Sequence, residues 1–306
     1  MRQFKPEGSV WSRFSGIRKS LVEGYIADGS IIEAPVLKCD EDMNLHFELG
    51  LNIYGVISFD EFEYSPSNRK TKGAAVVSRV AKSTCFKIIS SEEDSEGKLK
   101  VTLSRKAAQR ECYEEYISKL QIGQVIDARI TRIEDYGAFC DIGCGIIALL
   151  PMEHFCVTRL KDPKAALRQF KNIKAIVKDI DEDGRVVLSH KELLGTWEEE
   201  VAKFNIGDVV AGIVRVVEDY GAFIELTPNL AGLSEPIDGL HSGDVVSVAI
   251  KGIVPEKMKV KLVVTDTENT SRPYVKLDYR IPEGGVVKDW KYSPDECSKV
   301  IESHFN

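Results

Sequence analysis

The chain has 306 residues, of which 43% are hydrophobic and 29% are charged, as is typical of a soluble globular protein of two or three domains. It contains no stretch near the ~20 apolar residues of a membrane helix, and its first residues lack the apolar core of a signal peptide. Seven cysteines without a CxxC pair favour reduced thiols. We therefore expect a cytoplasmic protein with no membrane partner. The net charge of −7 restricts any nucleic-acid site to a local cationic surface.

The first hundred residues predict a helical segment followed by an eroded copy of a unit that recurs later in the chain. Residues 1–30 include an amphipathic stretch at 10–27, which favours a helix. Val101–Lys106 matches Val186–Lys191 at an offset of 85, and this match marks residues 31–106 as a degenerate barrel. Its long loop at 61–84 carries three cations, Arg69, Lys70 and Lys72.

A helical linker at 107–121, rich in Ala, Glu and Arg, leads to a second unit at 122–191. Alternating apolar and polar residues predict five strands in this unit. Asp183-Gly184 supplies the positive φ angles of a tight hairpin between the last two. Five strands with a long loop between the third and fourth fit a closed barrel of the oligonucleotide-binding type. The predicted strands are Val125–Arg132, Gly137–Ile142, Ile147–Leu150, Lys174–Ile180 and Arg185–Ser189.

A third unit at 206–266 repeats the second. Glu134–Phe139 returns almost letter for letter as Glu218–Phe223, 84 residues further on. The offset falls to 74 where Arg185–Leu188 aligns with Lys259–Leu262, so ten residues are missing from the loop between the third and fourth strands. A repeat at a fixed offset indicates a tandem array.

Two capping boxes predict helices outside the units. Thr196-Trp197-Glu198-Glu199 lies in a helical linker at 192–205, where Thr196 can accept from the third amide of the helix. Ser293-Pro294-Asp295-Glu296 predicts a short helix to about His304, within a tail at 267–306.

These motifs resemble the RNA-binding S1 domain, the family named for bacterial ribosomal protein S1. The resemblance is carried by Ile-Gly-x-Val, Asp-Tyr-Gly-Ala-Phe, a Gly-Leu pair and Asp-Gly-Arg-Val-Val-Leu-Ser. It implies an all-β fold with helical connectors, built from tandem five-stranded OB-fold barrels of the S1 type. It also implies single-stranded RNA as partner, contact with the ribosome or ribosomal proteins, and a role in bacterial translation or RNA metabolism.

By resemblance, the aromatic residues of the RNA face are Tyr136 and Phe139, and its last hairpin supplies Asp181 and Arg185. Bases stack on such rings with about 1–3 kcal/mol each, without sequence preference. Strict strand alternation sends Tyr136 and Phe139 to opposite faces, so Gly137 must bend or bulge the strand for both to serve. The alternatives are that one ring belongs to the core, and that Asp181 and Arg185 form a hairpin salt bridge.

A basic loop and a missing histidine complete the middle unit. Seven basic residues lie between Arg159 and Lys178, and from these we expect Lys164, Arg168 and Lys171 to hold the RNA backbone. The alternative is an ordinary solvated face. The position of the family's histidine is occupied by Pro151. His154, three residues on, could substitute for it, but we expect His154 to be an ordinary surface histidine.

The third unit keeps Tyr220 and Phe223 and has Lys259 at the arginine position, but Glu235 and Pro255 replace the histidine and the aspartate. Residues 206–264 carry five basic and eight acidic residues, against eleven and ten in residues 122–191. We therefore predict that the middle unit is the main RNA site. The first unit has lost the platform, and we expect it to be structural or to contact a protein. Its matching positions are Met43, His46, Ser58 and Lys100.

The competing hypothesis is a protein-interaction adaptor that docks on the ribosome or a regulatory partner. The acidic balance and Glu235 favour it. No phosphate loop, HExxH or GxSxG motif is present, so we do not expect an enzyme or a cofactor. The cluster of Cys140, Cys144, His154 and Cys156 lacks the spacing of zinc sites, so we expect no metal.

Overall fold

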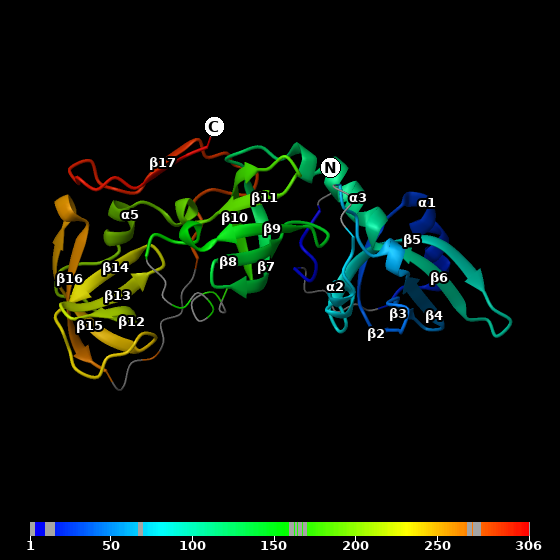
Figure 1. Ribbon diagram of the computed structural model, residues 1–306, viewed down its shortest axis with the longest axis horizontal. Helices are drawn as coiled ribbons and strands as arrows, with labels where there is room; N and C mark the ends of the chain where they lie inside the picture. The colour runs from blue at the N-terminus through cyan, green and yellow to red at the C-terminus, as the bar shows by residue number, and fades with distance from the viewer. Residues whose placement is uncertain are drawn as a thin grey trace.

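The computed structural model describes residues 4–9, 16–66, 70–158, 162, 164, 167, 170–267, 271 and 277–305. Three β units lie one after another along the longest axis of the molecule, in chain order (Figure 1). Within these residues, no helix is both long enough and apolar enough to cross a membrane.

The first unit is a six-stranded sheet in the order β1-β5-β6-β4-β3-β2, and its two end strands, β1 and β2, are separated in the chain by only two residues, so the sheet curves back to its start. Pro35 ends β1 and has no N–H to donate. The next residue, Val36, bridges to Val80, and the N–H of Leu37 then donates to the carbonyl of His46 on β3 over 2.8 Å. The strands are β1 (Ile31–Pro35), β2 (Lys38–Cys39), β3 (Leu45–Gly50), β4 (Ile53–Ile57), β5 (Ser83–Glu93) and β6 (Leu99–Ser104).

Short helices surround this sheet. Helix α1 begins within the predicted N-terminal helical segment, although residues 10–15 of that segment lie outside the described residues. The predicted linker helix is also present, as α3 followed by one 3-10 turn. The helices are η1 (Lys19–Leu21), α1 (Val22–Asp28), η2 (Phe59–Glu61), α2 (Gly73–Val77), α3 (Arg105–Glu115) and η3 (Ile117–Lys119).

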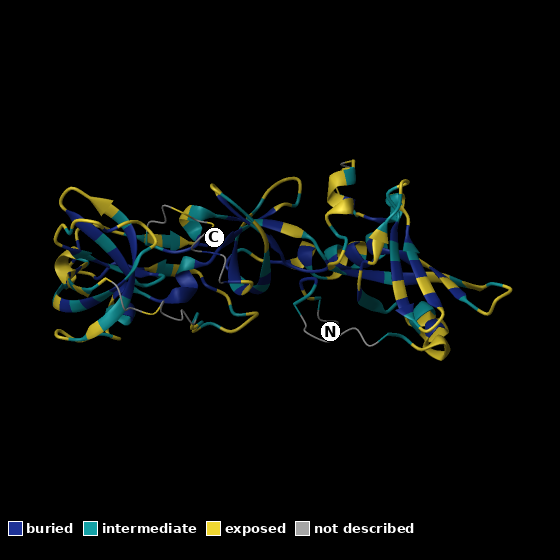
Figure 2. Cartoon of the chain, turned by 90° about the horizontal axis from the view of Figure 1, so that it is seen from below, coloured by how far each residue is buried: buried dark blue, intermediate teal, exposed yellow. Residues whose placement is uncertain are grey.

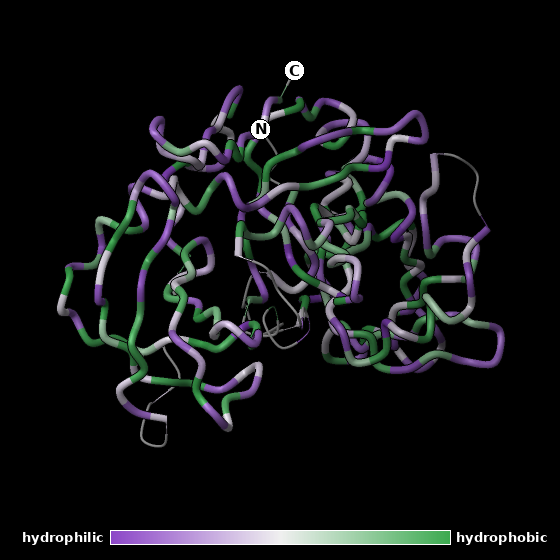
Figure 3. The backbone as a smooth tube through the Cα atoms, turned by 60° about the vertical axis from the view of Figure 1, so that its left-hand side comes forward, coloured by the Kyte–Doolittle hydropathy of each residue, from purple (hydrophilic) through white to green (hydrophobic). Residues whose placement is uncertain are grey.

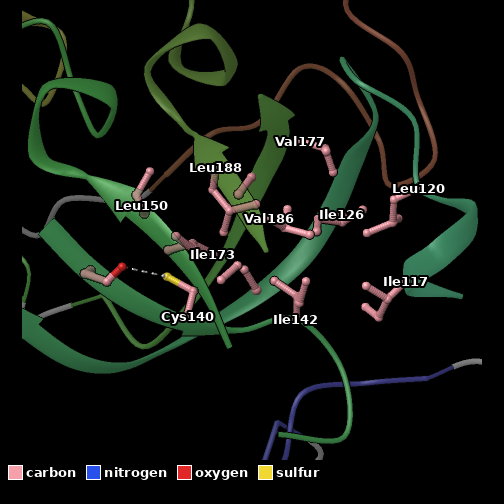
Figure 4. Packing of buried hydrophobic residues seen from close by; sticks show 14 of the residues in the cluster. Ile117, Leu120, Ile126, Cys140, Ile142, Leu150, Ile173, Val177, Val186 and Leu188 are labelled. Atoms are coloured by element: carbon pink, nitrogen blue, oxygen red, sulfur yellow. Dashed lines mark hydrogen bonds between the residues drawn. The ribbon is translucent and has the colours of Figure 1, made fainter. Parts of the chain in front are cut away.

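The middle unit is a closed barrel in the order β10-β11-β9-β8-β7. All five predicted strands are confirmed, with bounds that shift by at most two residues. Inward-pointing side chains such as Ile126, Leu150 and Leu188 fill the barrel (Figure 4). Closure of the sheet also leaves no strand with an unpaired edge. The strands are β7 (Val125–Glu134), β8 (Gly137–Asp141), β9 (Ile147–Pro151), β10 (Asn172–Ile180) and β11 (Val186–Ser189).

The third unit is a second closed barrel with the same connectivity. Its fourth strand carries a bulge at Lys251, where β10 of the middle barrel carries one at Lys178. The capping box of the linker is confirmed, because Thr196 Oγ1 accepts from the amide of Glu199. The strands are β12 (Val209–Glu218), β13 (Gly221–Thr227), β14 (Leu230–Ser234), β15 (Val245–Val254) and β16 (Lys259–Asp266), and the helices are η4 (Met152–His154), η5 (Lys191–Leu194), α5 (Trp197–Val201) and η6 (Pro255–Lys257).

Buried and exposed residues alternate along the strands of all three units. Figure 2 shows this as bands of alternating burial, and Figure 3 shows the matching alternation of hydropathy along the backbone. The period of two places one side of each strand in the core and the other at the surface. Outward positions on the barrels are therefore the places where a binding surface can form.

A short N-terminal segment, residues 4–9, joins the first unit to the middle barrel. The carboxylate of Glu7 is buried against Arg105, at 2.9 Å between Oε1 and Nε, and against Arg79, at 2.7 Å between Oε2 and Nη2. The backbone N–H of Glu7 donates to Asp141 of β8 over 2.8 Å. Both units are thus tied to one residue, and a buried carboxylate of this kind is stable because its charge is paired.

The C-terminal tail packs back on the middle barrel. Val125 exchanges backbone hydrogen bonds with Gly284 and Gly285, at 2.9 and 2.8 Å. The side chains of Val287 and Phe305 cover Val125 in a small buried cluster. The tail then forms a hairpin from β17 (Asp289–Lys291) and β18 (Glu302–His304), which runs over the middle and third barrels in Figure 1.

The short helix predicted at Ser293 is wrong. Residues 293–300 form turns, and β18 occupies part of the expected helix. The hydroxyl oxygen of Ser293 accepts from the amide of Ile301, eight residues away, over 2.8 Å. Because Ser293 closes a loop instead of capping a helix, pairing within the hairpin replaces the local helical hydrogen bonds.

Candidate nucleic-acid interface

Tyr136 and Phe139 lie side by side on the outside of the middle barrel. The Tyr136 side chain is 61% exposed, and Phe139 is half-buried beside it. Their ring centroids are 6.2 Å apart and their planes meet at 89°. Such an edge-to-face pair is a favourable aromatic geometry, and it leaves ring faces open to solvent. The structure therefore places neither ring in the barrel core.

The predicted bend at Gly137 is not how the two rings reach one side. The pairing of β8 with β9 is unbroken at Gly137, and the bulge lies instead on β7, between Ile130 and Arg132. Tyr136 belongs to the turn before β8, so strand alternation does not apply to it. Glycine is needed at 137 for another reason, because a Cβ there would lie 2.5 Å from the carbonyl oxygen of Leu150.

Arg132 is a member of this surface that the motif did not indicate. It lies opposite Phe139 in the β7–β8 register, and its guanidinium carbon lies 4.5 Å from the centre of the Phe139 ring. It also pairs with Glu134 over 3.1 Å. A guanidinium over an aromatic face offers charge to a phosphate and a plane to a base. The alternation along β7 together with the pairing register is the signal that could have identified it.

The hairpin residues Asp181 and Arg185 are arranged as a turn. The Asp181 carboxylate accepts from the backbone N–H of Arg185 over 2.8 Å, and Gly184 has φ of +74°. The Arg185 guanidinium pairs with Asp183 at 2.5 Å and lies 3.8 Å from Asp181. The hairpin salt bridge considered as an alternative is therefore present. Arg185 remains at the surface, where exposed pairs of this kind contribute little and exchange partners readily.

The family's histidine position is occupied differently. His154 is not a free surface residue, because Lys178 donates from its ammonium group to Nε2 over 2.8 Å. Burial, then the nearby charges of Lys178 and Lys191, lower the pKa of His154 to about 4. His154 is therefore neutral near pH 7, and Lys178 carries the positive charge at this place.

The basic loop is described only in part. Lys164 extends to Asp135, 3.3 Å away, beside the turn that carries Tyr136. Lys171 is exposed, and Arg168 lies outside the described residues. Lys164 is thus close to the aromatic pair, and it is partly neutralised by an acid of the same turn.

The third barrel repeats the aromatic pair almost unchanged. Tyr220 is 63% exposed, and its ring lies 6.2 Å from Phe223 at 88°. The counterpart of Arg132 is Val216, which pairs with Phe223 in the register, so the guanidinium is lost. Glu235 is exposed and lies 3.9 Å from Lys251.

Two lysines of the third barrel occupy outward positions near Phe223. Lys261 pairs with Leu233, which itself pairs with Phe223, so the three residues form one transverse row. Lys259, the residue predicted by resemblance, lies two positions earlier on the same side and is exposed. Lys261 was not predicted, although the alignment already sets it against Val187 of the middle barrel.

The equivalent positions of the first unit carry no aromatic platform. Met43 has a positive φ of 62° in the turn between β2 and β3, and His46 pairs with Asp40 over 2.8 Å. The outward side of this unit instead exposes apolar residues, of which Leu51 is 91% exposed.

The cysteine and histidine cluster is dispersed. Cys140 points into the barrel core, and burial raises its pKa to about 12. Across the described part of the chain, no three His, Cys, Asp or Glu side chains come together in a way that could hold a metal ion.

The fold and this surface together define a tandem-barrel protein of the oligonucleotide-binding type, with outward aromatic pairs on two barrels. Residues 119–191 match the family model described as the S1 RNA binding domain. The small ribosomal subunit protein bS1 of Leuconostoc lactis is 33% identical over 161 residues, 48% of this chain and 37% of that protein. The bS1 homolog of Bacillus subtilis is 29% identical over 172 residues, 52% of this chain and 45% of that protein.

The chain therefore resembles bS1 and contains a segment, residues 119–191, that matches the S1 RNA binding domain, and it spans less than half the length of these curated relatives. Among solved structures, a multidomain protein with nucleic acid binding domains from Streptococcus pneumoniae aligns with a TM-score of 0.25 and 15% identity. That alignment covers 78% of this chain and 73% of the other chain.

Proposed function

We propose that this protein binds single-stranded RNA without catalysis, in bacterial translation or RNA metabolism, and that the middle barrel is the main site. The match to the S1 RNA binding domain falls on this barrel. The observation that carries the proposal is the exposed Tyr136–Phe139 pair, with the Arg132 guanidinium 4.5 Å from the centre of the Phe139 ring. Unpaired bases stack on such rings, and the cations beside them attract the backbone.

Three differences favour the middle barrel over the third. Arg132 has become Val216, the family's histidine position holds the acid Glu235, and the basic loop is ten residues shorter. A carboxylate beside the stacking surface repels phosphate. The third barrel is then a weaker extension of the site through Tyr220 and Phe223, with Lys259 and Lys261 as backbone contacts.

The test measures binding of labelled single-stranded RNA to the full chain by fluorescence anisotropy at two salt concentrations. Replacing both Tyr136 and Phe139 by Ala removes the stacking surface, and we expect a loss of at least tenfold, since each stacked base contributes about 1–3 kcal/mol. The matched control replaces Tyr220 and Phe223, which have the same geometry, and should weaken binding less. Equal losses from the two double variants would contradict the middle barrel as main site.

Salt dependence separates stacking from charge attraction alone. The affinity of the wild type should fall steeply with salt because phosphate contacts release counterions. Binding that keeps its full strength in the Tyr136→Ala, Phe139→Ala variant would mean that the rings do not contact RNA. Exchanging Lys164, Arg168 and Lys171 for Glu should weaken binding to all sequences alike.

The second candidate function is a protein-docking adaptor. The net charge of −7, the exposed Glu235, and the apolar exposed residues of the first unit, among them Leu37 and Leu51, favour it. On this hypothesis the wild type does not bind RNA even at low salt.

A further inference from the structure

A cleft of about 370 Å³ lies between the first unit and the last hairpin of the middle barrel. It is distinct from the aromatic surface formed by Tyr136 and Phe139. Its lining comes from residues 63–66, 70, 72 and 75 of the first unit, from Gln109 and Tyr113 of α3, and from residues 145–147 and 183–185 of the middle barrel. Six lining residues carry its chemistry: Tyr64, Lys70, Lys72, Tyr113, Asp183 and Arg185.

Two tyrosines give the cleft an aromatic side. The rings of Tyr64 and Tyr113 are 5.8 Å apart and tilted by 58°, and the guanidinium carbon of Arg110 lies 5.4 Å from the centre of the Tyr64 ring. Both tyrosines are half-buried, so each keeps part of its ring accessible. An aromatic pair backed by a guanidinium is a surface on which a base can pack.

The cationic side of the cleft suits a phosphate. Lys70, Lys72 and Arg185 face Glu63 and Asp183, so its charged lining carries one more positive than negative group. Arg185 pairs with the exposed Asp183, and an exposed pair of this kind can yield to a phosphate that offers more oxygen acceptors. A ligand that is both aromatic and anionic fits this lining better than a purely apolar one.

The walls of the cleft are held in place by hydrogen bonds across the unit boundary. The side chain of Gln109 on α3 accepts from the backbone N–H of Tyr64 over 3.0 Å and donates to the carbonyl of Cys144 over 3.0 Å. One residue thus links the first unit to the loop between β8 and β9. Binding therefore does not have to order the part of the cleft around Tyr64 and α3.

The cleft is continuous with the aromatic surface of the middle barrel. Phe139, Leu149 and Val187 form one outward row across β8, β9 and β11. Arg185 lies two residues before Val187 on the same side. Strand geometry places it roughly 10 Å across and 7 Å along the sheet from Phe139. A single-stranded RNA that runs from Tyr136 across Phe139, Leu149 and Val187 therefore reaches the cleft at Arg185.

We propose that the cleft is a second subsite for the RNA that lies on the middle barrel, and that it takes one nucleotide of the same strand. The base packs against Tyr64 and Tyr113, and Lys70, Lys72 and Arg185 hold its phosphate. The cleft lies at the small end of the usual range for ligand pockets, ~300–1,000 Å³, which admits one nucleotide and excludes a duplex. This subsite rests on the proposed function, and it gives the degenerate first unit a part in binding.

The experiment uses the full chain and two labelled oligouridines, of about 5 and about 12 nucleotides, which lie in the lower and upper parts of the range of site sizes for one barrel, about 4–16 nucleotides. One test variant replaces Tyr64 by Ala, and another replaces Lys70 and Lys72 by Glu. The matched control replaces Lys98 and Lys100 by Glu. These residues lie on the first unit at the β5–β6 hairpin, which points away from the middle barrel in Figure 1.

We expect both test variants to bind the long oligonucleotide about tenfold more weakly and the short one as well as the wild type does. For the long oligonucleotide, the slope of log affinity against log salt concentration should also become smaller in the charge variant, by about one for each phosphate contact that is lost. The control should keep the wild-type slope. Circular dichroism checks that each variant is folded. Ultraviolet crosslinking of the long oligouridine to wild-type protein should place Tyr64 or Tyr113 among the modified residues.

Three results overturn the subsite. They are equal effects of the test and control charge variants, equal losses for short and long oligonucleotides, and crosslinks confined to the middle and third barrels. Each leaves the proposed function intact when the Tyr136→Ala, Phe139→Ala variant still weakens both oligonucleotides. Failure of the wild type to bind either oligonucleotide would instead overturn the proposed function itself.

Discussion

Replacing Glu7 by Gln should destabilise the junction between the first unit and the middle barrel. The Glu7 side chain is 2% exposed and the Arg105 side chain 5%. The substitution keeps the shape of Glu7 but leaves Arg105 buried without its counter-charge. Breaking one partner of a buried pair typically costs about 3–5 kcal/mol. The effect should therefore be among the larger ones expected for a single substitution.

The pKa of Glu7 is lowered by the same two arginines. Burial raises its pKa, but the attraction of Arg105 and Arg79 outweighs burial and lowers the pKa from 4.5 to about 2. A depressed carboxyl pKa stabilises the fold above pH 4.5, and this contribution is lost as the pH falls towards 2.

Urea unfolding followed by circular dichroism measures the effect. A loss of about 3 kcal/mol lowers the midpoint by roughly 1–2 M. The matched control is Glu93→Gln, which breaks the exposed Lys19–Glu93 pair and should cost less than about 1 kcal/mol. Changing Arg105 to Met as well should restore part of the stability, because it removes the unpaired charge. Equal midpoints for Glu7→Gln and Glu93→Gln would refute the reasoning.

Three further predictions concern other buried polar groups. Burial, together with the charge of Glu7, raises the pKa of Asp141 to about 7. The protonated carboxyl therefore contributes stability below pH 4, and this contribution is lost as the pH rises through 7. In thermal unfolding, Asp141→Asn should make the melting temperature less dependent on pH over this range. Burial lowers the pKa of His190 to about 4, so stability present above pH 6.5 should fall as the pH drops towards 4, and His190→Asn should weaken that fall. Asn229→Ala removes a side chain that accepts from Val157 and donates to Lys191, and it should cost about 1–3 kcal/mol in urea unfolding, whereas an effect below 0.5 kcal/mol would contradict a structural role for this contact.

Much of the fold could be predicted because the determining interactions are local or repeated. Strand alternation located all five strands of the middle barrel, and Gly184 adopts the positive φ that its hairpin requires. The capping box at Thr196 formed as its sequence indicates. In each case the residues that interact lie within a few positions of one another, or the same sequence pattern occurs in both the middle and the third unit.

The errors arose where distant residues compete with local ones. Ser293 has the sequence of a helix cap but bonds to Ile301 in a hairpin. The strand that begins the first unit is interrupted after Pro35, where Val36 bridges to Val80, a contact that no local pattern encodes. The burial of Glu7 against Arg105 joins residues 98 positions apart, so the first residues of the chain gave no sign of it.

The candidate site was predicted in part for the same reason. The exposed positions of Tyr136 and Phe139 follow from the S1 motif, while the reason they share a side required the register of β7 and β8. Arg132 reaches Phe139 only through that pairing, and Lys178 of β10 meets His154 of η4 although the two lie 24 positions apart. Motifs therefore identified the rings, and tertiary contacts determined which cations accompany them.

The backbone bonds between Val125 and Gly284-Gly285 have a consequence for biosynthesis. Domains generally fold as units, the earlier ones first, while the ribosome is still adding residues. The rim of the middle barrel, however, acquires its last partners only after the entire third barrel has been synthesised. The nascent chain must therefore carry a middle barrel in which Val125 lacks these backbone partners until residues 284–305 have been synthesised.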